Sequence, residues 1–279
     1  MQFQTSHSLR CGGSLISLDT PLVMGILNIT PDSFYDGGRF DRMESALQQA
    51  EKMILEGARI LDLGAATSKP GSPLISADEE SKRLLPVLKA VVEAFPEILI
   101  SIDTYNSATA RAAIEKGAHI INDISAGNID PDMMSTVGEM KVPYIMMHMQ
   151  GTPETMQNNP QYGHVVEDVK LFFAQKVDEA YAAGITDIVL DPGFGFGKSL
   201  RDNFQMLAAF ETFKTLNLPL LAGLSRKSMI YKTLDSTPQE ALNGTSALHS
   251  IALYKGAKIL RVHDVQEAME CIKLMEALN

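Results

Sequence analysis

Eight short, almost wholly apolar runs recur along the 279-residue chain, and each is followed by a polar or glycine-containing patch and then a helical pattern. The runs occupy residues 23–27, 60–63, 99–102, 120–121, 144–147, 188–190, 220–222 and 259–262. Many of their residues are β-branched, which is typical of strands buried on both faces of a parallel sheet. This repeating pattern restricts the fold more than any other feature of the sequence.

Apolar residues at helical spacing fill the intervals between these runs. The clearest stripes lie in residues 165–183 and 265–278, and the other candidates are 43–56, 77–95, 107–116, 132–140, 200–216 and 245–255. Glycine follows four of these segments, at a position where helix C-caps favour it. Eight strand-then-helix units predict an α/β fold, a single (β/α)8 TIM barrel. An open doubly wound sheet is the alternative, but no glycine-rich fingerprint follows the first strand.

The start of the chain has a different pattern. Residues 3–18, interrupted by Gly12 and Gly13, are typical of a short N-terminal β-hairpin that could cap the floor of the barrel. No linker or low-complexity segment divides the rest. We therefore predict one domain over residues 1–279, with the hairpin in 1–20 and the barrel in 21–279, rather than two domains of the usual size.

The charge balance limits the partners. The chain has 24 Lys and Arg against 34 Asp and Glu, a net charge of −10, which suits neither nucleic acid nor an anionic membrane. The uncharged run between Asp19 and Asp32 is too short to span a bilayer, and residues 1–8 contain no signal-peptide core. Cys11 and Cys271 show no metal or redox spacing. We expect a cytoplasmic protein that binds small molecules.

Polar residues lie at or just beyond the end of every apolar run, and in a barrel these ends converge on one site. They are Asn28, Asp62, Asp103, Asn122, Asp123, His148, Asp191, Ser225, Arg226, Lys227, Arg261 and His263. Asp and Asn also occur at such positions as helix caps, but capping does not explain Lys227, Arg261 and His263. Acids and amides on one arc and cations on another suit a ligand with a hydrogen-bonding heterocycle at one end and phosphate at the other.

Long connections follow the first, second and fifth runs, at residues 28–42, 64–76 and 148–164, and are typical of lids or substrate loops. A glycine-rich segment, residues 191–198, resembles a nucleotide loop, but Pro192 occupies the position where a P-loop requires glycine. We interpret the segment as a tight turn whose backbone approaches a flat ligand, with Phe194 and Phe196 available for stacking.

The remaining histidines carry no comparable signal. His7, His119, His164 and His249 show no metal-ligand spacing, and we expect them to be ordinary surface or helix residues.

Seven motifs, in this order along the chain, resemble the dihydropteroate synthase family of pterin-binding barrels. They are GILNITPDSF with DGG at residues 25–38, SIDT at 101–104, IND at 121–123, MHMQG at 147–151, LDPGFGFGK at 190–198, SRKS at 225–228 and RVHD at 261–264. The resemblance covers nearly the whole chain. It implies a transferase that condenses 6-hydroxymethyl-7,8-dihydropterin diphosphate with p-aminobenzoate, giving 7,8-dihydropteroate and pyrophosphate. It also implies a homodimer, and the apolar stripes of the last helices could form its interface.

The same resemblance implies a role for each matching residue. Asp103, Asn122, Asp191 and Lys227 match pterin-binding positions. Asn28, Ser68, Arg261 and His263 match diphosphate-binding positions, with Asn28 also the expected ligand of Mg²⁺. Phe196 and Ser228, together with Phe34, Asp36, Lys69 and Pro70 of two loops, match the p-aminobenzoate side. Asn28, Lys227, Arg261 and His263 are the expected catalytic residues.

The chemistry agrees with this set. An aromatic amine is unprotonated at neutral pH and needs no strong base, so the demanding step is breaking the C–O bond to diphosphate. Mg²⁺ at Asn28, with Arg261 and His263, would stabilise the negative charge that develops on the leaving group. The electron-rich pterin can delocalise the positive charge left on the methylene, which favours a dissociative path.

The second loop departs from the family pattern, which often reads GESTRPG where this chain has AATSKPG at residues 65–71. Ser68 keeps a hydroxyl for phosphate. Lys69 keeps the charge but lacks the planar fork of arginine, and Ala66 lacks a carboxylate. These differences bear on the substrate loops and on sulfonamide sensitivity more than on the reaction.

Three other functions remain as alternatives. Lys227 could be the Schiff-base lysine of a barrel aldolase, with Arg226 lowering its pKa. A folate-dependent methyltransferase of the same superfamily would not need the TPDSF loop at residues 30–34 or the Arg261 and His263 pair. A catalytically silent pterin-binding protein would have little reason to keep so many matching polar positions.

Overall fold

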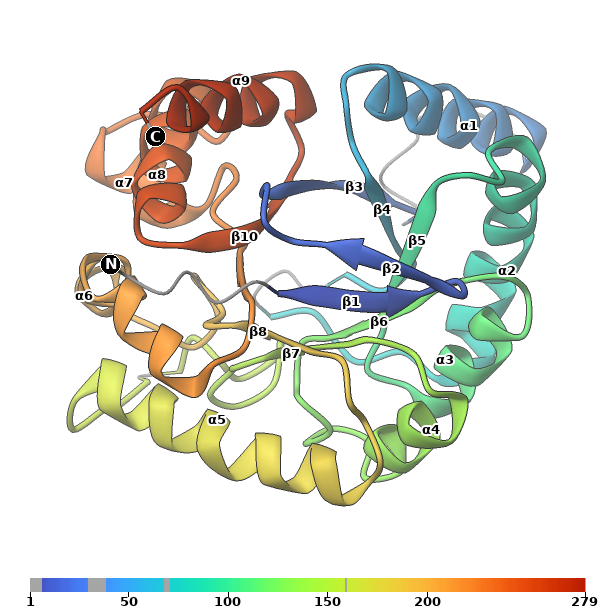
Figure 1. The fold of residues 1–279 in the computed structure, drawn as a ribbon, viewed down its shortest axis with the longest axis horizontal. Helices are drawn as coiled ribbons and strands as arrows, with labels where there is room; N and C mark the ends of the chain where they lie inside the picture. Colours follow the sequence, from blue (N-terminus) through green and yellow to red (C-terminus); the bar gives the residue numbers. More distant parts are fainter. Residues whose placement is uncertain (1–6, 30–38, 68–70, 159, 279) are drawn as a thin grey trace.

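Eight parallel strands close into a barrel (Figure 1), in a computed structural model that describes residues 7–29, 39–67, 71–158 and 160–278. The strand order around the barrel is β10-β3-β4-β5-β6-β7-β8-β9. Their bounds are β3 Leu22–Asn28, β4 Ile60–Gly64, β5 Leu99–Asp103, β6 Ile120–Asp123, β7 Tyr144–Met147, β8 Ile188–Asp191, β9 Leu220–Ala222 and β10 Ala257–Val262. All eight predicted strands are present, and the predicted (β/α)8 barrel is confirmed.

Helices surround the barrel on its outside (Figure 1). They are α1 Arg39–Leu55, α2 Ala77–Ala94, α3 Ser107–Ile114, α4 Met133–Met140, α5 Val165–Ala182, α6 Leu200–Ala208, α7 Ser228–Thr233, α8 Leu242–Tyr254 and α9 Val265–Glu276. None of these helices, within the residues that the structure describes, is long and apolar enough to cross a bilayer.

The predicted helix over residues 200–216 is wrong in its second half. The α-helix ends at Ala208, and a 3-10 helix, η2 Phe210–Leu216, follows it. Phe210 and Phe213 are both fully buried, and Leu216 packs against the same core. Residues three apart lie on one face of a 3-10 helix, which has three residues per turn, so the tighter helix turns all three side chains toward the core.

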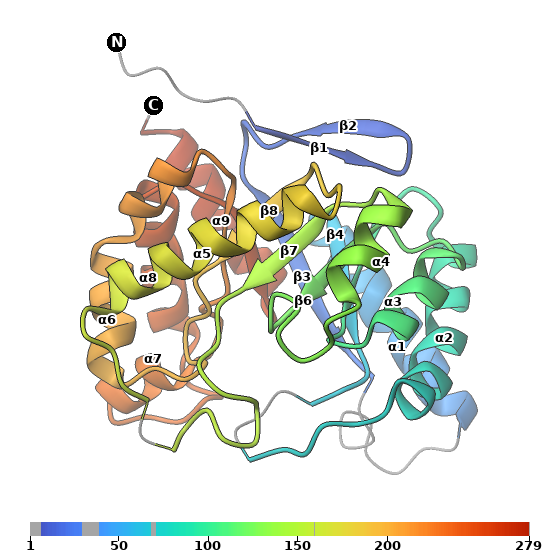
Figure 2. The same cartoon turned by 90° about the horizontal axis from the view of Figure 1, so that it is seen from below.

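An N-terminal hairpin closes one end of the barrel, and the connections that follow the strands lie at the other end (Figure 2). Strands β1 Ser8–Cys11 and β2 Ser14–Ser17 pair antiparallel around Gly12 and Gly13, which both have positive φ, as a two-residue hairpin turn requires. Leu9, Cys11 and Leu18 pack against the apolar residues that fill the near end of the barrel. The predicted cap on the barrel floor is confirmed.

Inside the barrel, a layer of apolar side chains is followed directly by a layer of mostly polar side chains, two residues further along the strands. The hairpin contacts a layer formed by Met24, Ile60, Ile120, Ile145, Val189, Leu221 and Ile259. Strand side chains alternate between faces, so the residue two positions later points into the barrel again, one layer higher. In four strands that next residue is Asp62, Asn122, Asp191 or Arg261. The polar layer therefore rests directly on a dry, fully packed floor.

Candidate active site

Arg261 of β10 reaches past β3 inside the barrel and forms charged hydrogen bonds with carboxylates of β4 and β5. Its Nε donates to Oδ2 of Asp62 at 2.6 Å, and its Nη2 donates to Oδ2 of Asp103 at 2.7 Å. Asn122 of β6 donates from Nδ2 to the same oxygen of Asp62 at 3.0 Å. Asp62 is fully buried, and its other oxygen, Oδ1, has no hydrogen-bond partner among the described residues. Arg261 therefore lies among the predicted pterin-binding residues, with its charge shared between two carboxylates.

Burial affects the two carboxylates at the edges of this group. It raises the pKa of Asp103 to about 7, although the neighbouring charge of Arg261 opposes the rise. It also raises the pKa of Asp191, where Lys227 and the backbone N–H of Gly193 oppose it. The Gly193 N–H donates to Oδ1 of Asp191 at 2.8 Å. A ligand that donates hydrogen bonds to these oxygens would favour their ionised forms.

Lys227 lies near Asp191 and contacts the residues that follow it in the glycine-rich segment. Its ammonium donates to the carbonyl of Phe194 and lies 4.1 Å from the ring centroid of Phe196, a cation–π contact. Burial, with a smaller contribution from the charge of Arg261, lowers the pKa of Lys227 to about 8, although the neighbouring carboxylate of Asp191 opposes the fall. Ser228, the first residue of α7, is half-buried beside it.

An apolar wall continues from Phe196. Tyr105, Ile124, Met147, Met149 and Met156 form a buried cluster, and Phe196 packs against it. Phe194, which the sequence suggested as a second stacking ring, is fully buried and stacks on Phe210 at 6.0 Å instead. That expectation was wrong, because Phe194 faces outward into the core between the barrel and α6. Of the two phenylalanines in the glycine-rich segment, Phe196 is the one whose ring lies beside the site.

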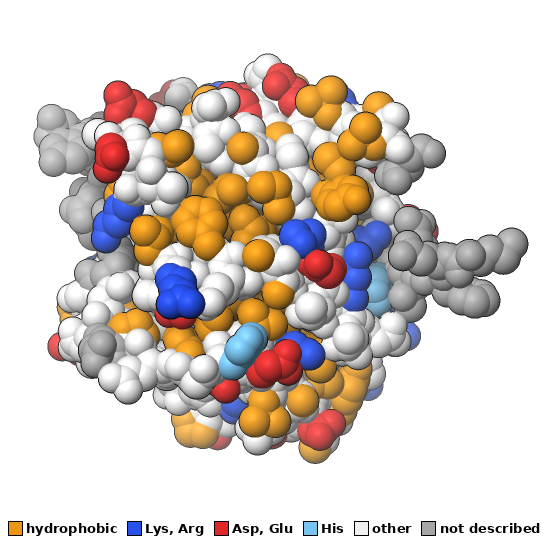
Figure 3. Space-filling model, turned by 90° about the vertical axis from the view of Figure 1, so that its left-hand side faces the viewer, with side chains coloured by type: hydrophobic (Ala, Val, Ile, Leu, Met, Phe, Trp, Pro, Cys, Tyr) orange, Lys and Arg blue, Asp and Glu red, His pale blue; other side chains and the backbone are white. Residues whose placement is uncertain are grey.

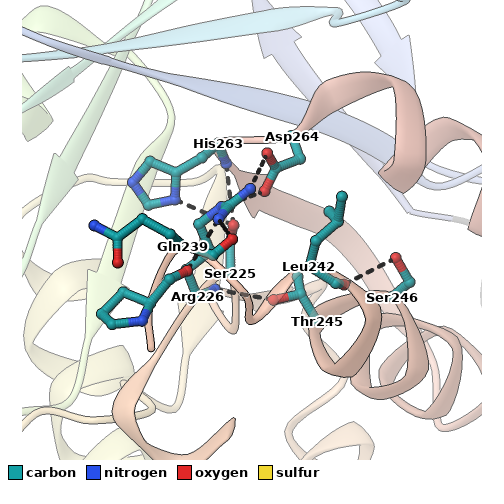
Figure 4. A network of polar contacts seen from close by, with 9 residues as sticks. Ser225, Arg226, Gln239, Leu242, Thr245, Ser246, His263 and Asp264 are labelled. Atoms are coloured by element: carbon teal, nitrogen blue, oxygen red, sulfur yellow. Dashed lines mark hydrogen bonds and ion pairs between the residues drawn. The ribbon is translucent and has the colours of Figure 1, made fainter. Parts of the chain in front are cut away.

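The rim of the site is held by a network of polar contacts between the loops after β9 and β10 (Figure 4). Ser225 Oγ accepts from the backbone N–H of His263 at 3.2 Å and contacts its Nδ1 at 3.1 Å. Loss of hydration at the crowded mouth and the nearby charge of Arg261 lower the pKa of His263 to about 4, although the residue keeps an exposed outer side. His263 is thus neutral at physiological pH.

Arg226 points away from the site. It pairs with both oxygens of Asp264 at 2.8 Å and donates to the carbonyls of Pro238 and Gln239 (Figure 4). The carboxylate of Asp264 neutralises the charge of Arg226. The lowered pKa of Lys227 is caused instead by burial and by the charge of Arg261. The suggestion that Arg226 lowers the pKa of Lys227, made for an aldolase, is therefore wrong.

Neighbouring residues of β6 serve different purposes. Asn122 points into the barrel, whereas Asp123 accepts hydrogen bonds from the hydroxyl of Tyr144, both the N–H and Oγ of Ser125, and the N–H of Gly127, all within 2.8 Å. Asp123 therefore organises the loop after β6 and is a structural residue.

The structure describes only some of the predicted site residues. Asn28 lies exposed at the end of β3, in register with Gly64, which is itself paired with Asp103. Phe34, Asp36, Ser68, Lys69 and Pro70 lie outside the described residues. Within the described part of the chain, no group of three or more His, Cys, Asp or Glu side chains is arranged to hold a metal ion.

Sequence reasoning placed Asp62 at a strand end but left it out of the site. The signal for it was present: Asp62 follows the interior residue Ile60 by two positions, as Asn122 follows Ile120. Lys198 was considered only as part of the glycine-rich segment. Its contacts with the loop after β7 depend on the fold and carry no local signal.

Comparison with known proteins defines the class first: the family model described as "Pterin binding enzyme" matches residues 24–263. The dihydropteroate synthase of Escherichia coli K12 is 43% identical to this chain, over 95% of this chain and 94% of that protein. The dihydropteroate synthase of Haemophilus influenzae is 42% identical, over 96% of this chain and 98% of that protein. The chain belongs to the pterin-binding enzymes and, among them, to the dihydropteroate synthase family.

Solved structures agree with this assignment. The dihydropteroate synthase of Yersinia pestis in a sulfonamide drug complex matches with a TM-score of 0.91 at 40% identity, over 98% of this chain and 99% of that chain. The Xanthomonas albilineans enzyme in complex with 7,8-dihydropteroate matches with a TM-score of 0.88 at 36% identity, over 98% of both chains.

Proposed function

We propose that this chain condenses 6-hydroxymethyl-7,8-dihydropterin diphosphate with p-aminobenzoate, forming 7,8-dihydropteroate and pyrophosphate in folate synthesis. The observation that carries this proposal is the buried polar layer of Asp62, Asp103, Asn122, Asp191 and Arg261, with Lys227 beside it. It offers several acceptors and two cations above a dry floor, which suits a flat heterocycle rich in hydrogen-bond donors.

The acceptors of this layer would read the pterin ring. Asp62 accepts from Nδ2 of Asn122, which leaves the Asn122 amide oxygen to accept a hydrogen bond from the ligand. Asp103 and Asp191 offer carboxylate oxygens, and Lys227 offers a donor. Because these groups are buried, a ring that fails to pair with them would leave them unsatisfied, and this cost makes the pocket selective.

The leaving diphosphate would lie toward the mouth, near Asn28 and His263, with Ser68 and Arg261 as further contacts. His263 is neutral in the free site, and a bound diphosphate would raise its pKa and favour the charged form. The charged form of His263, together with Arg261, would stabilise the negative charge that develops on the leaving oxygen as the C–O bond breaks.

Mg²⁺ fits this mouth as an ion that arrives with the substrate. The described residues hold no cluster of acidic or histidine ligands, but the Asn28 side chain is a hard oxygen donor in an exposed position. Mg²⁺ typically binds one or two protein oxygens together with substrate phosphates and water. When bound, it would neutralise part of the diphosphate charge.

The second substrate would enter along Phe196 and Ser228, with Phe34, Asp36, Lys69 and Pro70 of the two loops around it. Phe196 and the methionine-rich cluster offer an apolar wall for an aromatic ring. The lone pair of the unprotonated amine then forms the C–N bond to the methylene carbon as the C–O bond to diphosphate is lost, pyrophosphate leaves with the electron pair of that bond, and the new ammonium releases its proton to solvent. The sulfonamide complex of the Yersinia pestis enzyme supports inhibition of this chain by the same class of drug.

The deciding experiment is pyrophosphate release by the purified protein with the pterin diphosphate, Mg²⁺ and p-aminobenzoate. We expect release only when both organic substrates are present. Pterin binding without release would favour the silent alternative, and methyl transfer from a folate to a corrinoid would favour the methyltransferase.

We also propose that two copies associate through the helices near the C-terminus. Ile251 and Tyr254 of α8, Leu234 just after α7, and Leu274 of α9 are large apolar residues left exposed. Figure 3 shows apolar side chains gathered on the side of the molecule that carries α6, α7 and α8.

A cytoplasmic location agrees with the two cysteines, which are buried and unpaired.

A further inference from the structure

The glycine loop, which we define as residues 193–197, has every one of its backbone carbonyls held by a side chain. Lys198 Nζ donates to the carbonyls of Gly193 and Phe196 at 2.9 and 3.0 Å, and Lys227 donates to that of Phe194. Gln157 and Tyr162 hold the remaining two, those of Gly195 and Gly197, at 3.1 and 2.6 Å. A loop with no regular secondary structure is thereby held in one conformation.

Two of the glycines are required by the close approach of the neighbouring loop. A Cβ atom at Gly193 would lie 2.0 Å from the carbonyl oxygen of His148, and one at Gly197 would lie 2.5 Å from that of Gln150. Both glycines also have positive φ, of 71° and 59°. The glycine loop is therefore pressed against the loop that follows β7.

Lys198 fastens these two loops together. Its ammonium lies 2.9 Å from Nδ1 of His148 and 3.2 Å from the carbonyl oxygen of the same residue, in addition to its two contacts with the glycine loop. Lys198 is only 3% exposed, and among the described residues its hydrogen-bond partners include no carboxylate. Burying an ammonium in this way is costly unless its hydrogen bonds are satisfied, so the arrangement depends on all of these acceptors.

Neutral His148 completes the arrangement. Burial lowers its pKa to about 2, and the charge of Lys198 lowers it as well. The neutral imidazole can therefore accept at Nδ1 and keep its proton on Nε2. The ring also packs edge-on against Phe172 of α5 at 4.8 Å, which fixes its orientation.

The glycine loop connects the two halves of the site. Its first residue, Gly193, donates to Asp191, and its carbonyl at Phe194 accepts from Lys227, whose ammonium lies over the ring of Phe196. A shift of the loop would move Phe196 and Lys227 together, whereas Asp62, Asp103 and Asn122 are anchored by other strands.

We propose that Lys198 is a positioning residue, which clamps the glycine loop against His148 and so holds Phe196 and Lys227 in place for the aromatic amine substrate. The proposal rests on the proposed function, because it assigns Phe196 to the p-aminobenzoate side. Lys198 itself touches no reacting atom in this proposal.

The test compares Lys198→Met with Lys258→Met. Lys258 also donates to a backbone carbonyl, that of Asp19 at 3.3 Å, but at the floor of the barrel. For Lys198→Met we expect KM for p-aminobenzoate to rise about tenfold or more, because small misplacements in a site have large effects. The dissociation constant of the pterin diphosphate should rise clearly less, by about twofold to threefold, because Lys227 is one of several pterin contacts while Asp62, Asp103 and Asn122 stay anchored by other strands. Lys258→Met should change neither quantity.

An unchanged KM in a folded Lys198→Met protein overturns the proposal, and so does an equal loss of affinity for both substrates, which indicates general loosening. If Lys198→Met does not fold, His148→Leu removes the Nδ1 acceptor and should raise the same KM; an unchanged KM there also overturns it. If the wild-type protein releases no pyrophosphate, the proposed function fails, and a crystal structure of Lys198→Met then decides. Unmoved Phe196 and Lys227 in that structure would overturn the clamp.

Discussion

At the scale of single residues, the guanidinium of Arg261 is the central charge of the site. It lies between carboxylates from two other strands, Asp62 and Asp103, and the Asp62 side chain is fully buried. Removing one member of such a group leaves an uncompensated buried charge, which costs more than removing both. We therefore expect substitution of Arg261 to combine a loss of stability with the loss of its proposed catalytic role.

A double-mutant comparison separates the two effects. We expect Arg261→Met to lower the free energy of unfolding by roughly 2–4 kcal/mol, because Asp62 then lacks its cation. Adding Asp62→Asn removes the orphaned charge and should restore at least half of the loss, while turnover stays low in both variants. Urea unfolding and pyrophosphate release measure the two quantities. Equal unfolding free energies for the single and double variants would contradict this account.

At the scale of elements, the alternation of side chains along β6 separates function from structure. Asn122 points into the barrel and bonds to Asp62, whereas Asp123 accepts four hydrogen bonds that order the following loop. The sequence shows an Asn-Asp pair at a strand end, and a shift of one residue exchanges the two roles. Only the apolar floor residue Ile120, two positions before Asn122, tells them apart.

Adjacent substitutions on β6 should therefore have opposite results. Asp123→Ala is expected to cost roughly 2–4 kcal/mol of unfolding free energy, because it leaves buried donors such as the Tyr144 hydroxyl unpaired. Asn122→Ala should cost less stability, about 1 kcal/mol, because only one hydrogen bond to Asp62 is lost, while it weakens pterin binding at least tenfold. Thermal unfolding and calorimetric titration with a pterin provide the measurements. Normal pterin affinity in Asn122→Ala would remove that residue from the site.

His249, expected as an ordinary surface or helix residue, lies buried in α8, and its Nε2 has no hydrogen-bond partner in the described part of the chain. Burial lowers its pKa from 6.5 to about 4. Because the unfolded chain takes up the proton first, stability is fully present above pH 6.5 and is lost as the pH falls toward 4. The loss attributable to this residue approaches about 3 kcal/mol at pH 4.

Comparison with His249→Gln isolates this effect from the other titrating groups, which both proteins share. Between pH 7 and pH 4, the unfolding free energy of the wild type should fall relative to that of the variant by up to about 3 kcal/mol. Urea unfolding at a series of pH values measures it. A difference that stays constant over this range would show that His249 gains hydration or a partner on protonation.

At the scale of the whole molecule, the exposed apolar residues of the C-terminal helices provide the surface for the proposed homodimer. Tyr254 is 78% exposed and Leu274 is 71% exposed, and a second copy of the chain would cover them.

Sedimentation of the wild-type protein and of Ile251→Asp/Tyr254→Asp tests the dimer. We expect a dimer for the wild type and a monomer for the variant, because two carboxylates would be buried without partners in each half of the interface. A matched control, Leu15→Asp, introduces a charge at an exposed leucine of the hairpin and should remain dimeric. A monomeric wild type, or a dimeric variant, would place the interface elsewhere or remove it.

The sequence alone determined the order of strands and helices and the N-terminal hairpin, because each depends on periodicity within a few residues. It also placed Asp103, Asn122, Asp191, Lys227 and Arg261 at strand ends that meet. The division at residue 20, and the roles of the residues on the two loops outside the described chain, stay predictions.

Only the tertiary structure decided which charges pair. Arg261 reaches Asp62 and Asp103, and Lys198 reaches His148, across 199, 158 and 50 residues of sequence respectively. Such contacts depend on how the eight strands are staggered when the barrel closes, a property of all of them together. Local periodicity contains no information on that stagger, which is why the pairing of Asp62 with Arg261 and the clamp at Lys198 emerge only from the folded molecule.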